Sequence, residues 1–281
     1  MNLKMRIDSE ARMRKALFVV LIILIIAGIS CGRQDKAPAT PAAASSPAGA
    51  QSEPSLHDRA AVLDVLRNGD QADIQQLLGR LAQDRQGWTD GAYDDLYRPL
   101  WNFFVRINAP GTSAPNQELI TALSNLFNFG DWYPLLVELL AVIKDPKAAF
   151  PVRQAAADHL WRFAGMAQSS GATFSIPPDD RTKIEAAVTD LLKDQDPGLL
   201  STAAMTAARL NMTKAIPRLK EIAATRRGEG FDTRALRFTI GESLFNLGEK
   251  AAALAIMTAM AGSKGDFSEE AAEFIKKNGT K

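Results

Sequence analysis

The sequence has little cysteine and histidine: it contains one cysteine and two histidines in 281 residues. One cysteine cannot form an internal disulfide, and three such ligands are too few for a four-ligand structural zinc site. The chain also lacks the GxGxxG, GxxxxGK[ST], HExxH and EF-hand patterns. We therefore expect no metal and no cofactor, and stability has to come from packing.

An excess of positive charge is absent as well. Lysine and arginine total 33 against 32 aspartate and glutamate residues, which gives a net charge of +1. Nucleic-acid affinity is dominated by neutralisation of phosphates by basic side chains. We therefore expect no nucleic-acid partner.

The N-terminal residues 1–30 have the composition of a secretory signal peptide. Five basic residues precede an uncharged run over residues 16–29, and small residues follow it. The run is shorter than the roughly 20 residues that a membrane-spanning helix needs. An export signal is therefore favoured over an anchor.

The end of this segment carries a second pattern. Gly28-Ile29-Ser30-Cys31 resembles the lipobox of bacterial lipoproteins, although the usual lipobox has leucine at the position of Gly28. The resemblance implies cleavage before Cys31 and its modification by acyl chains such as palmitate, two of which suffice for stable anchoring. A bystander cysteine in a conventional signal peptide and the end of an uncleaved anchor helix are the alternatives. Gly32 follows in place of the aspartate of a retention signal, which favours the outer membrane, facing the periplasm, if the source has two membranes.

Residues 31–55 form the next segment, Cys31 and a linker rich in alanine, proline and serine. Beyond the cysteine it has no valine, leucine, isoleucine or aromatic residue. Such a stretch cannot bury enough apolar surface to offset its chain entropy. We expect a disordered tether with a root-mean-square span of about 25–30 Å.

Residues 56–281 show helical periodicity throughout. Apolar residues recur at three- and four-residue spacing, and no segment alternates with period two over its length. Turn signals divide the region into ten or eleven expected helices. Asp179 or Asp180 and Ser268 are the expected N-caps of two of them.

Some of these helices repeat. The segments that begin at Val152, Leu199 and Leu236 align with their small and apolar positions in register, so that Arg153, Leu200 and Arg237 share one position. The landmark residues at 129, 163, 210 and 247 lie 34, 47 and 37 residues apart. These intervals bracket the about 40-residue period of two-helix repeats.

The repeats resemble the HEAT-repeat family, in particular its phycobilisome-lyase-like branch. The match is carried by Asp196-Pro197, by the alanine pair 203–204 and by 215–219, with Pro217 in the first turn of a second helix. The resemblance implies an all-α fold, a right-handed α-solenoid of about five helical hairpins. Residues 56–107 fit the hairpin form but carry little of the motif, and residues 268–278 suit a polar cap.

Catalytic candidates are scarce. Nucleophilic catalysis of the Ser-His-Asp type needs a histidine beside the nucleophile. His57 lies at the end of the linker, and His159 occupies the repeat position held by Thr206 and Ser243, which favours a packing role. We therefore assign no catalytic residue and predict that the protein is not an enzyme.

Candidate binding residues follow from the resemblance, because second helices line the concave face of HEAT arrays. The exposed positions of those helices are Lys183, Asp190, Arg218, Glu221 and Thr225.

Two tryptophans and two loops complete the candidates. Trp88 and Trp101 are large enough to anchor a protein or stack on a sugar, although burial is the commoner fate of such residues. The loops 108–116 and 167–180 interrupt the repeat, as the working faces of solenoids often do. The doublet Arg226-Arg227 is expected to satisfy a helix C-terminus.

The sequence therefore predicts a lipid-anchored scaffold or adaptor in a bacterial cell envelope, which binds a protein partner of unknown identity through its repeat surface. A glycan-binding or small-ligand module is the first alternative. A lyase-like or other enzyme subunit is the second, because some HEAT-like proteins are enzymes.

Overall fold

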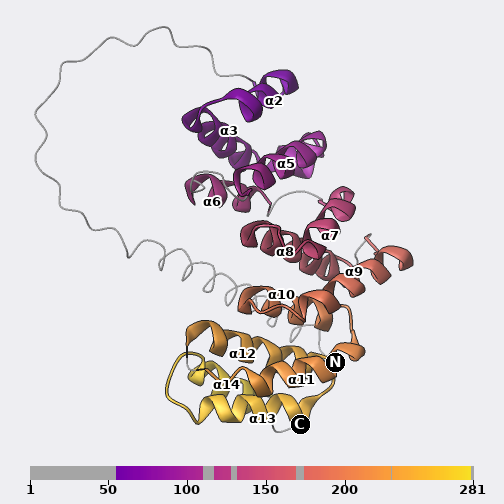
Figure 1. Ribbon diagram of the computed structural model, residues 1–281, viewed down its shortest axis with the longest axis vertical. Coiled ribbons are helices and arrows are strands. Elements are labelled where there is room, and N and C mark those ends of the chain that lie inside the picture. Colours follow the sequence, from indigo (N-terminus) through magenta and orange to yellow (C-terminus); the bar gives the residue numbers. More distant parts are fainter. Residues whose placement is uncertain (1–54, 110–116, 128–131, 169–173, 229, 280–281) are drawn as a thin grey trace, which may run out of the picture. The chain divides into compact units, whose positions relative to one another are not determined.

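The computed structural model describes residues 55–109, 117–127, 132–168, 174–228 and 230–279 (Figure 1). All regular secondary structure in these ranges is α-helix or 3₁₀ helix, and no strand occurs among them. The α-helices are α2 (Arg59–Asn68), α3 (Gln71–Gln83), α4 (Arg85–Thr89), α5 (Tyr97–Ile107), α6 (Gln117–Leu126), α7 (Leu136–Lys144), α8 (Phe150–Met166), α9 (Pro178–Leu191), α10 (Pro197–Arg209), α11 (Ile216–Thr225), α12 (Phe231–Asn246), α13 (Lys250–Ala261) and α14 (Ser268–Asn278). Short 3₁₀ turns, η1 (Asp94–Leu96), η2 (Tyr133–Leu135) and η3 (Thr213–Ala215), lead into α5, α7 and α11.

Aspartate side chains begin several helices. They accept hydrogen bonds from the first backbone amides, which have no partner inside a helix. Asp70 forms a reciprocal capping box with Asp73, and Asp196 Oδ1 accepts from the amides of Gly198 and Leu199 at 2.8 and 3.1 Å. The proline-containing turn predicted at 196–198 is therefore a helix start.

Two predicted N-caps are wrong. Helix α9 begins at Pro178, and Pro177 precedes it in place of an aspartate. Asp180 lies within the first turn, where its carboxylate accepts a hydrogen bond from the Tyr133 hydroxyl at 2.7 Å. Before α14 the cap residue is Phe267, with a φ of 63°, and Ser268 is already helical. The left-handed turn places the Phe267 ring 5.4 Å from that of Phe231.

In the predicted repeat frame the helices of the described ranges fall in chain order into the pairs α3/α5, α6/α7, α8/α9, α10/α11 and α12/α13 (Figure 1). Contacts also join the second helix of one pair to the first helix of the next, as α7 to α8, α9 to α10 and α11 to α12. First helices contact first helices, as α3 does α6, α8 does α10 and α10 does α12. Among the second helices, α7 contacts α9, and α14 covers α13 at the end of the series. The protein is an α-solenoid, and the predicted all-α solenoid architecture is confirmed.

Small residues allow the first helices to approach closely. Ala156 and Ala157 of α8 and Ala203, Ala204 and Ala207 of α10 have no exposed surface. A methyl group fills the narrow space between two helix backbones without forcing them apart. The alanine pairs of the repeat pattern are therefore packing residues.

Polar side chains connect neighbouring hairpins. Gln154 Nε2 of α8 donates to Thr202 Oγ1 of α10 at 2.9 Å, and Arg218 Nε of α11 donates to the carbonyl of Leu192 at 2.9 Å. Arg181 of α9 reaches the carbonyl of Leu210 in the same way, at 2.6 Å. These bonds satisfy polar groups in the contacts between repeats, where an unpaired group is costly.

Residues 1–54 lie outside the described residues, and so do the predicted signal peptide, Cys31 and nearly all of the predicted linker. The described helices belong to one compact unit, Glu53–Lys281. In the described part of the chain, no helix has both the length and the apolar character that crossing a bilayer requires.

Candidate functional site

The candidate residues of α9 are exposed but already paired. Lys183 Nζ lies 2.9 Å from Asp180 Oδ1, and Asp190 Oδ1 lies 2.7 Å from Lys193 Nζ. Each pair joins residues one helical turn apart, a spacing that suits ion pairing on a helix surface. Neither charge is therefore left for a partner without breaking a local contact.

The candidates of α11 are engaged in the same manner. Arg218 Nη1 forms an ion pair with Glu221 Oε2 at 2.9 Å, and the Thr225 hydroxyl donates to the Glu221 carbonyl at 2.9 Å. These residues remain on the surface, with Glu221 and Thr225 exposed and Arg218 half-buried. None of them presents a free charge.

The tryptophan candidates belong to the core. Trp88 is 3% exposed and Trp101 is 2% exposed, so the assignment of these two residues as partner-binding anchors is corrected. The indole of Trp88 lies 5.6 Å from the Tyr97 ring, and that of Trp101 lies 5.8 Å from Phe127. Burial prevailed because an indole contributes most when it is removed from water.

The described residues show no catalytic constellation. Both nitrogens of His159 are buried without a hydrogen-bond partner, so this histidine activates no nucleophile. Burial, and secondarily the nearby Arg162, lower the pKa of His159 from 6.5 to about 3. In the same ranges, no group of three or more His, Cys, Asp or Glu could hold a metal ion.

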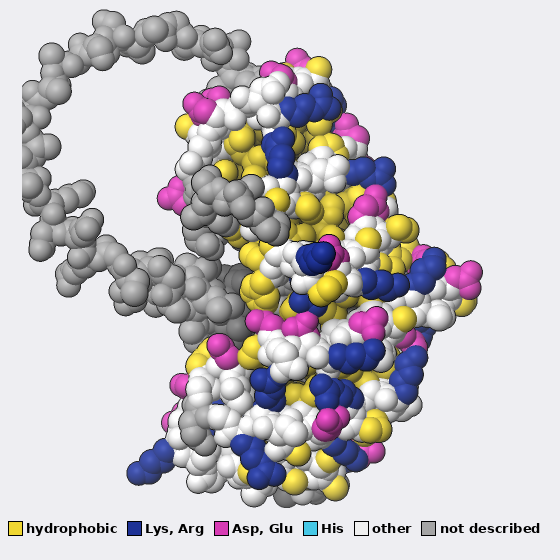
Figure 2. All heavy atoms as spheres, viewed as in Figure 1, with side chains coloured by type: hydrophobic (Ala, Val, Ile, Leu, Met, Phe, Trp, Pro, Cys, Tyr) yellow, Lys and Arg dark blue, Asp and Glu magenta, His cyan; other side chains and the backbone are white. Residues whose placement is uncertain are grey.

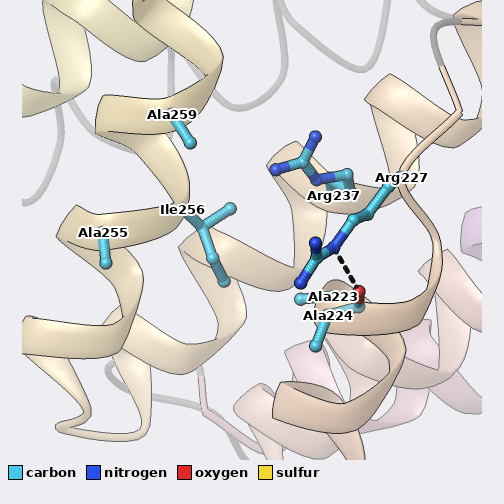
Figure 3. Close-up of a pocket in the computed structure, with 7 residues that line it drawn as sticks. All are labelled: Ala223, Ala224, Arg227, Arg237, Ala255, Ile256 and Ala259. Carbon is cyan, nitrogen blue, oxygen red and sulfur yellow. Dashed lines mark hydrogen bonds between the residues drawn. The ribbon is translucent and has the colours of Figure 1, made fainter.

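An open pocket lies where α11, α12 and α13 meet (Figure 3). It has a volume of about 520 Å³. Ala223 and Ala224 line it from α11, Arg237 from α12, and Arg227 from the segment after α11. Helix α13 contributes the remaining lining residues, which are Ala255, Ile256 and Ala259.

The two arginines direct their guanidinium groups toward the space beside α13 (Figure 3). Arg237 is half-buried, and its buried Nε has no hydrogen-bond acceptor among the described residues. Arg227 is exposed, and its Nε donates to the carbonyl of Ala224 at 2.6 Å. No carboxylate of the described ranges forms an ion pair with either guanidinium. Within the part of the chain that the structure describes, the pocket therefore carries two positive charges that form no ion pair.

Arg237 differs from the residues at the same position of the other repeats. Arg153 occupies the position of Arg237 in α8, and it is ion-paired with Asp194 in the turn after α9. The same position of α10 holds Leu200, which is 1% exposed. Of the two equivalent positions, one thus holds an ion-paired arginine and the other a buried leucine, whereas Arg237 forms no ion pair with any carboxylate that the structure describes.

The surface beside the arginines is uncharged. Helix α13 has the sequence KAAALAIMTAMA, in which only Lys250 carries a charge. Its exposed positions beyond the first residue are Ala251, Ala255, Thr258 and Ala259. In the part of Figure 2 that contains α11 to α13, basic side chains lie among apolar and uncharged surface, with acidic side chains beside some of them.

A second pocket, of about 360 Å³, contains two different arginines between α8, α9 and α10. Both are engaged: Arg181 with Glu185 and the Leu210 carbonyl, and Arg209 with the Trp161 carbonyl and ring. The Arg209 guanidinium lies 3.8 Å from the centre of the Trp161 ring. This pocket is a packing feature with satisfied charges.

Sequence reasoning missed Arg237. It considered the doublet Arg226-Arg227, and the predicted role at a helix end is confirmed for Arg227 through its bond to Ala224. Arg226 instead reaches the side chain and carbonyl of Gln195. The signal that could have identified Arg237 is its alignment with Arg153 in the repeat frame, combined with the uncharged sequence of α13. Of the loops 108–116 and 167–180, residues 110–116 and 169–173 lie outside the described residues.

No protein-family model matches the sequence, and no curated protein sequence matches it. Solved structures with a similar arrangement are designed armadillo repeat proteins. One, in complex with the peptide (KR)4, has 16% identity and a TM-score of 0.44, and the match covers 75% of this chain and 95% of that one. Two others, one described as computationally designed for modular peptide recognition, have 17% identity and TM-scores of 0.40 and 0.39, with the same coverage. At these scores the fold rests on the helix packing described above.

Proposed function

We propose that the protein is a scaffold or adaptor of a bacterial cell envelope, which is tethered by a lipid at Cys31 and binds a protein partner. The observation that supports the binding role is the α11–α13 pocket, which combines an uncharged helix surface with two arginines that form no ion pair with a described carboxylate. A repeat array offers an extended surface for such contacts. The tether rests on the lipobox-like sequence at residues 28–31.

Two observations favour a binding role over the alternatives. The described residues contain no nucleophile paired with a base and no metal-ligand cluster, which is the machinery that an enzyme subunit would need. Trp88 and Trp101, which could have stacked on a sugar, are buried. Protein binding needs neither feature.

The binding role can be tested by photo-cross-linking in cells. A photoreactive amino acid placed at Ala255, which is exposed beside the pocket, should give a discrete adduct with one protein. The same probe at Ala72, exposed on α3, is the matched control and should not give that adduct. An identical adduct pattern at both positions, or none at Ala255, would argue against partner binding at this face.

The tether is tested separately. The Cys31→Ala variant should move from the membrane fraction to the soluble fraction, because the acyl chains supply the membrane affinity. Retention in the membrane fraction with unchanged electrophoretic mobility would contradict lipidation at Cys31. The cross-linking result does not depend on this outcome.

A further inference from the structure

We propose that the Arg227–Arg237 pocket receives a carboxylate side chain from an acidic segment of the partner protein. This inference rests on the proposed binding function and specifies the chemistry of the partner. The segment is expected to lie across α13, with its acidic residue between the two guanidinium groups and its flanking residues against the alanine surface.

The charge of Arg237 provides the first argument. Arginine remains protonated under all physiological conditions, and a half-buried guanidinium without an acceptor is unfavourable. Its planar donor fork matches a carboxylate, which can accept two parallel hydrogen bonds. A partner carboxylate in the pocket would accept from the terminal nitrogens of Arg237, which point into it (Figure 3), and Arg227 lines the same space.

The chain itself provides the second argument. At the equivalent position in α8, Arg153 is satisfied by the carboxylate of Asp194, and the pair is largely buried, with 17% of each side chain exposed. The same repeat geometry can therefore hold an arginine–carboxylate pair. At Arg237 the described ranges provide no such carboxylate, so the position is open to one from another molecule.

The lining of the pocket favours a peptide over a free anion. Four of its seven residues are alanines, Ala223 and Ala224 on one side and Ala255 and Ala259 on the other. Short side chains on both walls let a polypeptide backbone come close to the helices, as small residues do at close helix contacts. An inorganic anion would contact the arginines and leave this surface unused.

The size of the pocket agrees with this occupant. Its volume of about 520 Å³ exceeds what one carboxylate group fills, so neighbouring residues of the segment also enter. Thr258 and Ala251 extend the uncharged surface along α13. The specificity then comes from the arginine pair, and the contact area comes from the methyl surface.

Binding is measured with the full-length protein in detergent micelles and two labelled peptides. Both are alanine-rich, and they differ only in carrying glutamate or glutamine at the same positions. Fluorescence anisotropy should show at least about tenfold tighter binding of the glutamate peptide, because the amide cannot form the charge-assisted pair. Added salt should weaken the glutamate peptide more than the glutamine peptide.

Arginine variants locate the effect. Arg237→Gln and Arg227→Gln should each weaken the glutamate peptide by about tenfold and leave the glutamine peptide unchanged. Arg67→Gln removes the same charge from an exposed position on α2 and should have no effect. Circular dichroism verifies that all three variants retain their helices. If the arginine variants bind the glutamate peptide as the wild type does, the carboxylate assignment is wrong.

A blocking variant separates a peptide site from an anion site. Ala255→Trp fills the exposed wall of the pocket and leaves both arginines in place, so it should abolish peptide binding. Inorganic phosphate that protects both arginines from modification, with no preference for the glutamate peptide, would overturn the proposal in favour of an anion site. If the Ala255 cross-link to a cellular protein persists in the Arg237→Gln variant, the proposed function stands and only the carboxylate inference fails.

Discussion

The imidazole ring of His159 lies 5.3 Å from the indole of Trp132, inside the aromatic core that α5, α6 and α8 share. The centre of the Phe127 ring is 5.6 Å away and that of Trp101 is 6.4 Å away. The imidazole is therefore surrounded by aromatic rings, and both of its nitrogens lack a hydrogen-bond partner.

This burial predicts that His159 itself contributes a loss of stability as the pH is lowered. The pKa of His159 is about 3 in the folded protein and near its usual 6.5 in the unfolded chain. Between these values the unfolded chain binds a proton that the folded state does not, so stability is lost as pH falls from 6.5 toward 3, by up to about 1.4 kcal/mol per pH unit. Urea unfolding at pH 7 and pH 5 measures this contribution when the wild type is compared with a variant that lacks the imidazole.

The His159→Phe variant isolates this contribution. Its unfolding free energy should depend less on pH than that of the wild type, since the aromatic replacement fits the cluster and does not titrate. Asp158 and Glu242 act in the opposite direction, because desolvation raises the pKa of both carboxyl groups, that of Glu242 to about 7, and both residues are present in both proteins. His57→Gln, at an exposed position, is the control and should keep the wild-type pH dependence. Equal pH dependence of wild type and His159→Phe would contradict the prediction.

Glycine at position 87 is required by the packing of Tyr93. A Cβ added to Gly87 would overlap the ring of Tyr93, whose Cζ would lie only 2.8 Å away. The ring is fully buried and its hydroxyl donates to Asp84, so it cannot move aside easily. Gly87→Ala should destabilise the protein by about 1–3 kcal/mol in thermal or urea unfolding.

Gly79→Ala is the matched control. An added Cβ there meets no atom within 4 Å, and the residue lies inside α3. Alanine is the better helix former, so this variant should be more stable by about 0.5–1 kcal/mol. If the two substitutions shift stability in the same direction, the steric explanation for Gly87 fails.

Tryptophan fluorescence should report a protected core. Trp88, Trp101 and Trp132 are at most 3% exposed, whereas Trp161 is half-buried beside Arg209. Iodide should quench only a small part of the native emission and all of it after unfolding. The Trp161→Phe variant should lose most of the quenchable part. Extensive quenching in that variant would show that the other three tryptophans are accessible to solvent and would contradict their burial.

The cap of α10 gives a fourth prediction. Asp196→Ala removes the acceptor for the amides of Gly198 and Leu199 and should cost about 1 kcal/mol of unfolding free energy. Asp196→Asn keeps an acceptor oxygen at the same position and should retain most of the stability. Equal losses in both variants would show that the carboxylate charge, and not the hydrogen bond, matters there.

Much of the fold follows from local chemistry that can be read in the sequence. Asp196 followed by Pro197 predicts a helix start because carboxylate capping and the fixed φ of proline act over a few residues. Pro217 was likewise predicted in the first turn of a second helix, where α11 has it. The N-cap predicted for α14 is wrong, because Phe267 takes the cap position in a left-handed conformation and packs its ring against Phe231 and Phe238.

The sequence by itself determined the all-helical class, because apolar spacing and caps are properties of neighbouring residues. It predicted ten or eleven helices, whereas the described ranges contain thirteen α-helices, among them the five-residue α4 (Arg85–Thr89). The tertiary structure alone decided which charged and aromatic residues remain available. Trp88 and Trp101 are buried in the core, and Lys183 and Arg218 form ion pairs with Asp180 and Glu221. Arg237 became the candidate because its partners depend on what α11 and α13 bring beside it, and contacts between distant residues set that surrounding.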